Sequence, residues 1–260
     1  MRRFIRACVL AVPWAIGASW GLPAGAAAAG GEAVRQEADE TSIARRLQAL
    51  GSRIHLDADG RVQSIEAHNS NLTDADLSLL RHLPALETLE IGGGKITDAG
   101  LAHLARLTSL LRLYLHDLNV TDAGLKHLAG LTGLEALGLQ NTRIAGPGLV
   151  HLKRLAELQA LNLGNTQVDD DALAHVEHLV QLETLSLEKT RVTGKGLAHL
   201  KKMLRLRVLN LKHCDVSPPD LEHLVGIRSL KILWLTDTKV TREQAREFKN
   251  KMESIAIFFY

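Results

Sequence analysis

The hydrophobic positions of this chain repeat every 24 residues. Starting at Leu86, the pattern L-x-x-L-x-L-x-x-x-x-I recurs six more times, and Val62 extends it backwards by one unit. In the first half of each unit apolar residues alternate with others, as at Leu89 and Ile91, which is typical of a short strand. In the second half they take helical spacing, as in the leucines of residues 101–107. Each unit is therefore predicted to form one strand and one helix. The later recurrences begin at Leu110, Leu134, Leu158, Leu182, Leu206 and Leu230.

Eight such units fill residues 62–253 without an insertion, and they resemble leucine-rich repeats of the cysteine-containing subtype. The resemblance is carried by the pattern LxxLxLxxTxITDxGLxHLxxL, which occurs in many exported bacterial proteins and in the substrate-receptor subunits of some ubiquitin ligases. It implies an α/β solenoid shaped as an open horseshoe, with a parallel sheet on the concave face and helices on the convex face. The usual Asn or Cys of the loop position is mostly Thr here, and Cys214 is its only cysteine. A small donor can still bond the backbone of the neighbouring turn.

Segments on both sides of the repeats are predicted to cap the solenoid, because a repeat unit cannot bury its apolar face alone. Residues 30–61 are expected to form an N-terminal cap, a helix followed by the first arm of a hairpin whose second arm is the first repeat strand. Residues 254–260 are expected to form a C-terminal capping strand. Residues 57–60 resemble part of a calcium-binding loop, but the remaining ligands are missing, so we interpret them as a turn.

The first 29 residues have the features of a secretory signal peptide. Three arginines precede an apolar stretch at residues 7–22, and the small residues at 24–29 offer A-x-A cleavage sites. The predicted location is therefore periplasmic or extracellular, with no integral membrane span after cleavage. An uncleaved anchor is the alternative, because residues 7–29 are long enough to cross a bilayer.

Composition and charge narrow the class of partner. The chain of 260 residues is 46% hydrophobic, which is enough to bury a sizeable core. Its formal charge is +2, so removal of the three arginines of the first segment gives 2 − 3 = −1. No basic surface for nucleic acid is expected. Cleavage would leave Cys214 as the only cysteine, so no intramolecular disulfide is predicted.

Polar residues also repeat along the predicted helices. A position occupied by Thr, Asp or Ser is interpreted as the N-cap, and an aspartate after it places negative charge in the first turn.

A histidine also recurs once in most predicted helices. Neighbouring helices lie about 8–10 Å apart, whereas zinc ligands lie about 2.1 Å from the metal, and no carboxylate or cysteine recurs beside the repeated histidines. We interpret these histidines as structural wedges, with a metal, acid–base or pH-sensing role as the alternatives. The caps are Thr73, Thr97, Thr121, Asp169, Thr193, Ser217 and Thr241; the aspartates are Asp74, Asp98, Asp122 and Asp170; the histidines are His103, His127, His151, His175, His199 and His223.

No sequence motif for catalysis is found. The chain lacks H-E-x-x-H, C-x-x-C and a phosphate-binding glycine loop, and its one G-x-S-x-G, at residues 17–21, lies within the predicted signal peptide. GGGK at residues 92–95 is interpreted as a turn. We predict no enzyme activity, no catalytic residue, no metal site and no cofactor. A reactive thiol at Cys214 is the alternative.

The side chains between the strand leucines are predicted to project from the concave face, where they are free to contact a ligand. Tyr114 and Trp234 occupy equivalent positions five strands apart, roughly 24 Å, which suits a protein or a long polymer. Alternatively, Trp234 is covered by the C-terminal strand, with Phe258 beside it. The candidate ligand-binding residues are Arg112, Tyr114, His116, Asp117, Gln140, Asn162, Lys212, His213 and Trp234.

The predicted function is protein–protein interaction through the concave sheet of a non-enzymatic, exported module. One alternative is a structural envelope protein that self-associates through its terminal strand SIAIFFY, because an apolar sheet edge invites pairing. A weaker alternative is a carbohydrate binder, based on the polar trough and its aromatic residues.

Overall fold

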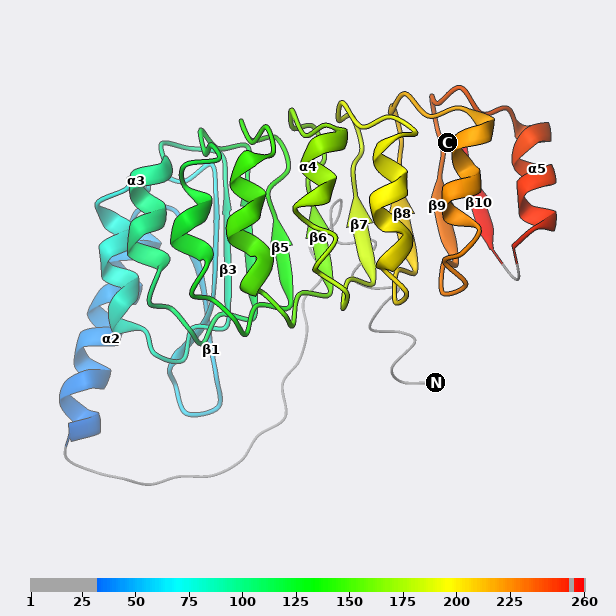
Figure 1. The fold of residues 1–260 in the computed structure, drawn as a ribbon. Helices are drawn as coiled ribbons and strands as arrows, with labels where there is room; N and C mark the ends of the chain where they lie inside the picture. The colour runs from blue at the N-terminus through cyan, green and yellow to red at the C-terminus, as the bar shows by residue number, and fades with distance from the viewer. Residues whose placement is uncertain (1–31, 253–254, 260) are drawn as a thin grey trace.

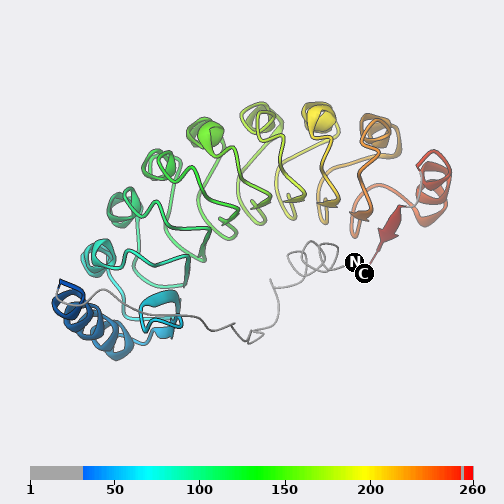
Figure 2. The same ribbon diagram turned by 90° about the horizontal axis from the view of Figure 1, so that it is seen from below.

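The structure, a computed structural model, describes residues 32–252 and 255–259. The predicted signal peptide at residues 1–29 lies outside them. Strands and helical segments alternate along the chain (Figure 1), and together they curve into an open arc with the strands on the inner side and the helical segments on the outer side (Figure 2). This arrangement confirms the predicted α/β solenoid with its sheet on the concave face.

The strands form one ten-stranded sheet in chain order from β1 to β10. The first pair is antiparallel and all later pairs are parallel. Parallel partners are 24 residues apart, as where Leu89 lies opposite Leu113. The helix α2 (Glu32–Ala49) precedes the sheet. The strands are β1 (Arg53–Leu56), β2 (Val62–His68), β3 (Thr88–Gly92), β4 (Arg112–His116), β5 (Ala136–Gly138), β6 (Ala160–Asn162), β7 (Thr184–Ser186), β8 (Val208–Asn210), β9 (Ile232–Trp234) and β10 (Ala256–Phe258).

The segments that return from one strand to the next are tighter than expected. The prediction of an α-helix in every unit is wrong for most units, because the segment that follows the strand is a 3₁₀-helix. A 3₁₀-helix rises about 2.0 Å per residue against about 1.5 Å for an α-helix, so it spans the depth of the solenoid with fewer residues. In the described residues, no helix has the length and apolar character needed to cross a membrane. The 3₁₀-helices are η1 (Asp76–His82), η2 (Ala102–Leu104), η3 (Leu125–Leu128), η4 (Pro147–Arg154), η5 (Gly196–Lys202) and η6 (Pro218–Leu224), and the α-helices are α3 (Asp98–Leu101), α4 (Asp170–Ala174) and α5 (Arg242–Asn250).

A single hydrophobic core runs the length of the solenoid, between the sheet and the helical segments. Ile43 and Leu47 of α2 close this core at one end, and Phe248 and Ile255 close it at the other. The strand leucines between these ends are at most 1% exposed, as seen at Leu89, Leu113, Leu137, Leu161, Leu185 and Leu209. Each unit thus supplies one layer of a continuous core.

Aspartates at the helix starts join consecutive units. Asp170 Oδ1 accepts the backbone N–H of Thr193 at 2.7 Å, and Asp170 Oδ2 accepts its hydroxyl at 2.6 Å. These carboxylates bind the residue at the predicted cap position of the following unit, a role that first-turn charge alone does not predict. Thr97 is the N-cap of α3 as expected, but the prediction is wrong for Thr121 and Thr193, because η3 and η5 begin later, at the N-caps Gly124 and Lys195. Gly196, three residues after Thr193, leaves room for Asp170. A Cβ on Gly196 would overlap the Asp170 carboxylate. The same two bonds join Asp74 to Thr97 and Asp98 to Thr121.

The threonines of the loop position bond within their own unit. The hydroxyls of Thr142, Thr166 and Thr190 each donate to the carbonyl three residues earlier, at 2.6, 2.6 and 2.7 Å. The expectation that this position bonds the neighbouring turn is therefore wrong for these threonines. It holds for Cys214, whose Sγ donates to the carbonyl of Leu187 in the preceding unit at 2.9 Å. Burial raises the pKa of the Cys214 thiol, which disfavours the reactive thiolate.

The bond between units predicts a difference between two adjacent aspartates of α4. Asp170→Ala should lower the free energy of unfolding by about 1–3 kcal/mol, because it leaves the Thr193 N–H without its acceptor. Asp171 is exposed and lies in the same helical turn, so Asp171→Ala removes the same charge without breaking this bond. It should lower the free energy of unfolding by less than about 0.5 kcal/mol. Urea unfolding followed by circular dichroism measures both. Equal losses would show that charge in the first turn, rather than the bond to Thr193, is what matters.

Candidate functional site on the concave sheet

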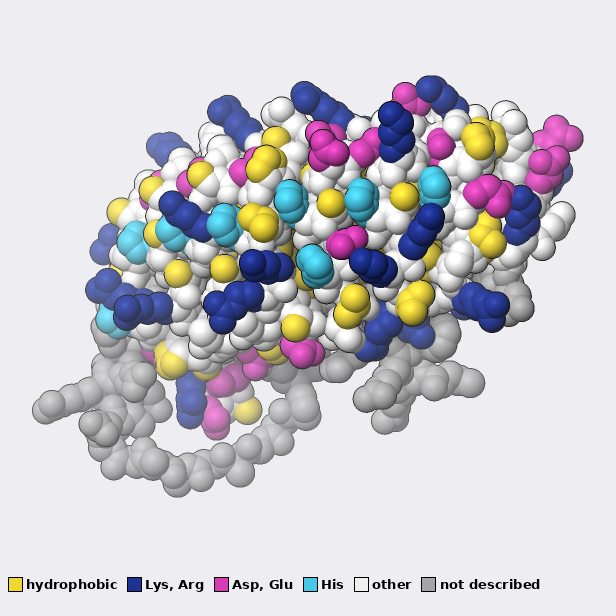
Figure 3. Space-filling model, viewed as in Figure 1, with side chains coloured by type: hydrophobic (Ala, Val, Ile, Leu, Met, Phe, Trp, Pro, Cys, Tyr) yellow, Lys and Arg dark blue, Asp and Glu magenta, His cyan; other side chains and the backbone are white. Residues whose placement is uncertain are grey.

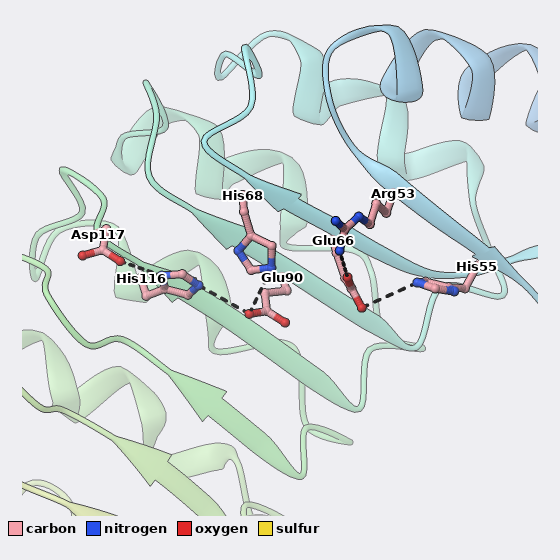
Figure 4. Close-up of polar contacts among 7 residues, drawn as sticks. All are labelled: Arg53, His55, Glu66, His68, Glu90, His116 and Asp117. Atoms are coloured by element: carbon pink, nitrogen blue, oxygen red, sulfur yellow. Dashed lines mark hydrogen bonds and ion pairs between the residues drawn. The ribbon is translucent and has the colours of Figure 1, made fainter. Parts of the chain in front are cut away.

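Charged side chains and imidazoles gather on the concave face of the first four strands (Figure 4). Glu66 pairs with two cationic groups of β1: His55 Nε2 lies 3.5 Å from Glu66 Oε1, and Arg53 NH1 lies 3.9 Å from Glu66 Oε2. We call this group the N-terminal polar cluster. It consists of Arg53, His55, Glu66, His68, Glu90, His116 and Asp117.

Three members of the cluster converge on one point. His116 Nε2 lies 3.4 Å and His68 Nε2 lies 3.6 Å from the same oxygen, Glu90 Oε1. The two imidazole centroids are 5.6 Å apart, with 34° between the ring planes. Among the described residues, this is the only group of three or more His, Cys, Asp or Glu whose ligand atoms all lie within 4.8 Å of one another. We call His68, Glu90 and His116 the triad.

The absence of a side chain at Gly92 leaves the space that the His116 ring occupies. His68, Gly92 and His116 are paired residues on β2, β3 and β4, so they form one row across the sheet. A Cβ on Gly92 would overlap the His116 ring. The His116 ring therefore lies over the middle strand of the three, in the space that a side chain at residue 92 would fill.

Asp117 fixes the other side of the His116 ring. It has a left-handed backbone conformation with φ of 57°, as do the equivalent residues of most units. Its N–H donates to the Gln140 carbonyl, just after β5 of the next unit, at 3.2 Å, and its Oδ2 lies 2.7 Å from His116 Nδ1. His116 is thus held by a carboxylate at each ring nitrogen, and only 18% of its side chain is exposed.

These contacts shift the protonation of the site. The hydrogen bond to Glu90 raises the pKa of His116; burial opposes this effect and Asp117 adds to it. Burial also raises the pKa of Tyr114, which lies beside Glu90 in the sheet. The cluster therefore favours an imidazolium at His116 when no other cation is present.

The remaining candidates near this end lie deeper than expected. Arg112 and Tyr114 are half-buried, and Arg112 NH1 donates to Thr88 Oγ1 at 3.2 Å. Gln140 is half-buried and its Oε1 has no hydrogen-bond partner among the described residues. Asn162 is only 6% exposed, and its Oδ1 accepts the N–H of Gly164 at 2.8 Å. The Asn162 carboxamide closes a local turn, and its role as a ligand-binding residue stays a prediction.

A second group lies at the far end of the concave face. Trp234 stacks on Phe258 with 4.4 Å between ring centroids and 24° between planes, and Lys212 Nζ lies 4.4 Å from the centre of the Trp234 ring. His213 Nδ1 lies 3.1 Å from Asp237 Oδ2. Trp234 is half-buried, so the alternative in which the C-terminal strand covers part of it is correct. We call Lys212, Trp234 and Phe258 the aromatic cluster.

The strands between the two clusters carry small side chains on the concave face. Ala136, Ala160, Thr184 and Ser186 are all at least 92% buried and add little height to the sheet. The concave face therefore carries small side chains in its middle and polar and aromatic side chains at its two ends.

The six repeated histidines lie on the opposite face of the molecule. Histidine side chains form a row across the helical face in Figure 3. His103 and His151 are exposed, and the others are half-buried. In the described residues none of the six belongs to a group with metal-ligand spacing.

His68 and Glu90 are not among the residues predicted from the sequence, although the repeat contains a signal for them. His68 and His116 are 116 − 68 = 48 residues apart, which is two units of 24, and Gly92 stands midway between them. A glycine between two histidines at equivalent positions leaves both rings room to approach each other. That relation becomes visible only when residues are compared across units rather than within one.

The comparisons with known proteins support the fold. No family model and no curated protein matches the chain. The solved structure of an internalin C2 from Listeria monocytogenes matches with a TM-score of 0.61 and 24% sequence identity, over 78% of this chain and 82% of that one. An internalin, inlF, from the same organism matches with a TM-score of 0.55 and 22% identity, over 74% of this chain and 58% of that one. At this identity the likeness shows a leucine-rich repeat solenoid.

The environment of His116 predicts its titration. In metal-free protein, His116 should titrate above the ordinary histidine pKa of about 6.5, and Glu90→Gln should lower that pKa. Because the folded pKa is raised, this protonation stabilises the fold fully below about pH 6.5, and the contribution is lost as pH rises through the folded value. Imidazole NMR measures each histidine. His127, whose pKa is lowered by burial and then by Lys126, is the internal control. A His116 pKa that Glu90→Gln leaves unchanged would refute the assigned hydrogen bond.

Proposed function

We propose that this chain is an exported recognition module that binds a protein partner on its concave sheet. The observation that carries the proposal is the run of small side chains on β5, β6 and β7, which lies between the N-terminal polar cluster and the aromatic cluster. Solenoid proteins use such extended concave surfaces for binding. The proposal includes no catalytic step.

The distance between the two clusters favours a macromolecular partner. Tyr114 and Trp234 are on β4 and β9, five strands apart, which is roughly 24 Å along the sheet before curvature. A small molecule cannot contact both ends, whereas a protein surface can. Half-buried Tyr, Trp and Arg side chains are also the residues that most often anchor protein interfaces. The fold-level likeness to internalins is compatible with this role.

Self-association through β10 is the alternative. This strand is at the edge of the sheet and its residues 256–258 are half-buried. An edge of three residues offers few backbone groups for pairing, which makes it a weak template. Concentration-dependent mass in solution distinguishes this alternative from recognition of another protein. If the chain instead binds carbohydrate, an added oligosaccharide should compete with the ligand for the concave face.

The concave-face proposal predicts the effect of a double substitution. Arg112→Ala with Tyr114→Ala should weaken binding of a partner captured from envelope extract of the source cell at least tenfold, about 1.4 kcal/mol. The matched control is His151→Ala with Arg154→Ala, which removes a ring and an arginine from exposed positions of η4 on the convex side. Binding of the identified, purified partner to each variant is measured by calorimetry, after circular dichroism has shown that the variant is folded. Equal binding by both double variants would contradict the proposed surface.

Export makes a separate prediction. Protein recovered from the envelope or medium of the source cell should lack residues 1–29 and begin at Gly30, because signal peptidase cleaves after small residues in an A-x-A pattern. Intact mass spectrometry measures the mature start. A full-length chain in the membrane fraction would instead support the uncleaved anchor.

A further inference from the structure

We propose that His68, Glu90 and His116 bind one zinc ion on the concave sheet. The triad offers two imidazole nitrogens and one carboxylate oxygen, which is a common donor set for three-ligand zinc sites. The inference stands on the geometry of the triad and does not depend on the proposed partner. It replaces the expectation of no metal site, which considered the helical histidines and the cysteine motifs but not the strand residues.

The spacing of the three donor atoms fits tetrahedral coordination. Zinc bonds of about 2.0–2.1 Å at the tetrahedral angle place any two ligand atoms about 3.4 Å apart. Glu90 Oε1 is 3.4 Å from His116 Nε2 and 3.6 Å from His68 Nε2, and the two nitrogens are within 4.8 Å of each other. Small rotations of the two rings would bring all three donors to one ion.

The backbone of the sheet allows the rings of His68 and His116 to approach each other, whereas the helical histidines have no such arrangement. His68 and His116 are two strands apart, so their Cα atoms are separated by roughly 9.6 Å. Their ring centroids are nevertheless 5.6 Å apart, because the His116 ring leans over the intervening strand at Gly92. Glu90 projects from that same strand, two residues before the glycine. One strand therefore supplies both the space and the third ligand.

A fourth residue prepares His116 for a metal. Asp117 Oδ2 lies 2.7 Å from His116 Nδ1, so this carboxylate holds a proton on Nδ1, and Nε2, which faces Glu90, is the nitrogen that gives up its proton when the ion binds. Histidine ligands in zinc sites usually have such a carboxylate partner, which fixes the ring and raises its basicity. Asp117 is thus a positioning residue and not a ligand.

The donor set selects the class of metal. Calcium and magnesium prefer sites made only of oxygen ligands, and the two imidazoles disfavour them. Imidazole and carboxylate suit divalent first-row metals, and three protein ligands with near-tetrahedral spacing favour zinc with water in the fourth position. Since 30% of the Glu90 side chain and 43% of the His68 side chain are exposed, the ion can enter from the concave side.

The test is zinc binding by the full chain prepared without a histidine tag and stripped with a chelator. Competition with a chromogenic zinc indicator measures stoichiometry and affinity, and Co²⁺ substitution reports geometry through its visible spectrum. We expect one zinc per chain, and a Co²⁺ spectrum with the intensity of four-coordinate cobalt. Absence of stoichiometric zinc binding would overturn the proposal.

Single substitutions locate the ion. His68→Ala, Glu90→Ala and His116→Ala should each weaken zinc binding at least 100-fold, and Asp117→Asn should weaken it about 10- to 100-fold. Gly92→Ala retains every ligand, yet it should also weaken binding because its Cβ displaces the His116 ring. His213→Ala is the control, since His213 is also on the concave side and paired with an aspartate.

Two results would refute the site. One is zinc affinity that His213→Ala lowers as much as His116→Ala does, which would indicate non-specific binding by surface histidines. The other is unchanged affinity in the folded His68→Ala/His116→Ala double variant, which would place the metal elsewhere. Circular dichroism establishes the fold of each variant, and Glu90→Gln provides a volume-conserving substitute where Glu90→Ala is unfolded.

Discussion

The whole structure depends on the stacking of units that cannot bury their apolar faces alone. Each unit of 24 residues presents its leucines to the next one, and the strands pair at that same offset. Because the offset is constant, equivalent residues lie beside each other about 4.8 Å apart along the entire sheet. Asp170 and its equivalents reinforce this by bonding a threonine of the following unit. A substitution at one residue of a row therefore alters the packing of the equivalent residues on both neighbouring strands.

The same constraint explains where chemistry arises. In a uniform row the side chains are parallel and each one blocks its neighbour from leaning sideways. At residue 92 a glycine interrupts the row, and the rings on either side approach each other over the gap. The six repeated histidines have no such interruption, and they stay apart on the convex face. A gap in the repeat, and not the repeat itself, brings the triad together.

The sequence predicts what a single unit contains and misses what two units share. The strand leucines, the loop threonines and the aromatic pair Trp234 and Phe258 follow from period and offset. The bond from Asp170 to Thr193 and the triad do not, because they depend on how side chains lean between units. The 3₁₀-helices were missed for another reason: apolar spacing alone separates them poorly from α-helix, and the length available to the return segment decides.

For the proposed recognition residues, a position on such a sheet would lower the entropic cost of binding. Tyr114 stands between Leu113 and Leu115, which are fully buried, so its backbone is fixed by the core before any partner arrives. His116 has both ring nitrogens engaged, and Trp234 is held between Phe258 and Lys212. Side chains already ordered in the free protein lose little conformational entropy on binding. The concave face therefore combines freedom to vary in sequence with rigidity in structure, since its residues alternate with the leucines and never replace them.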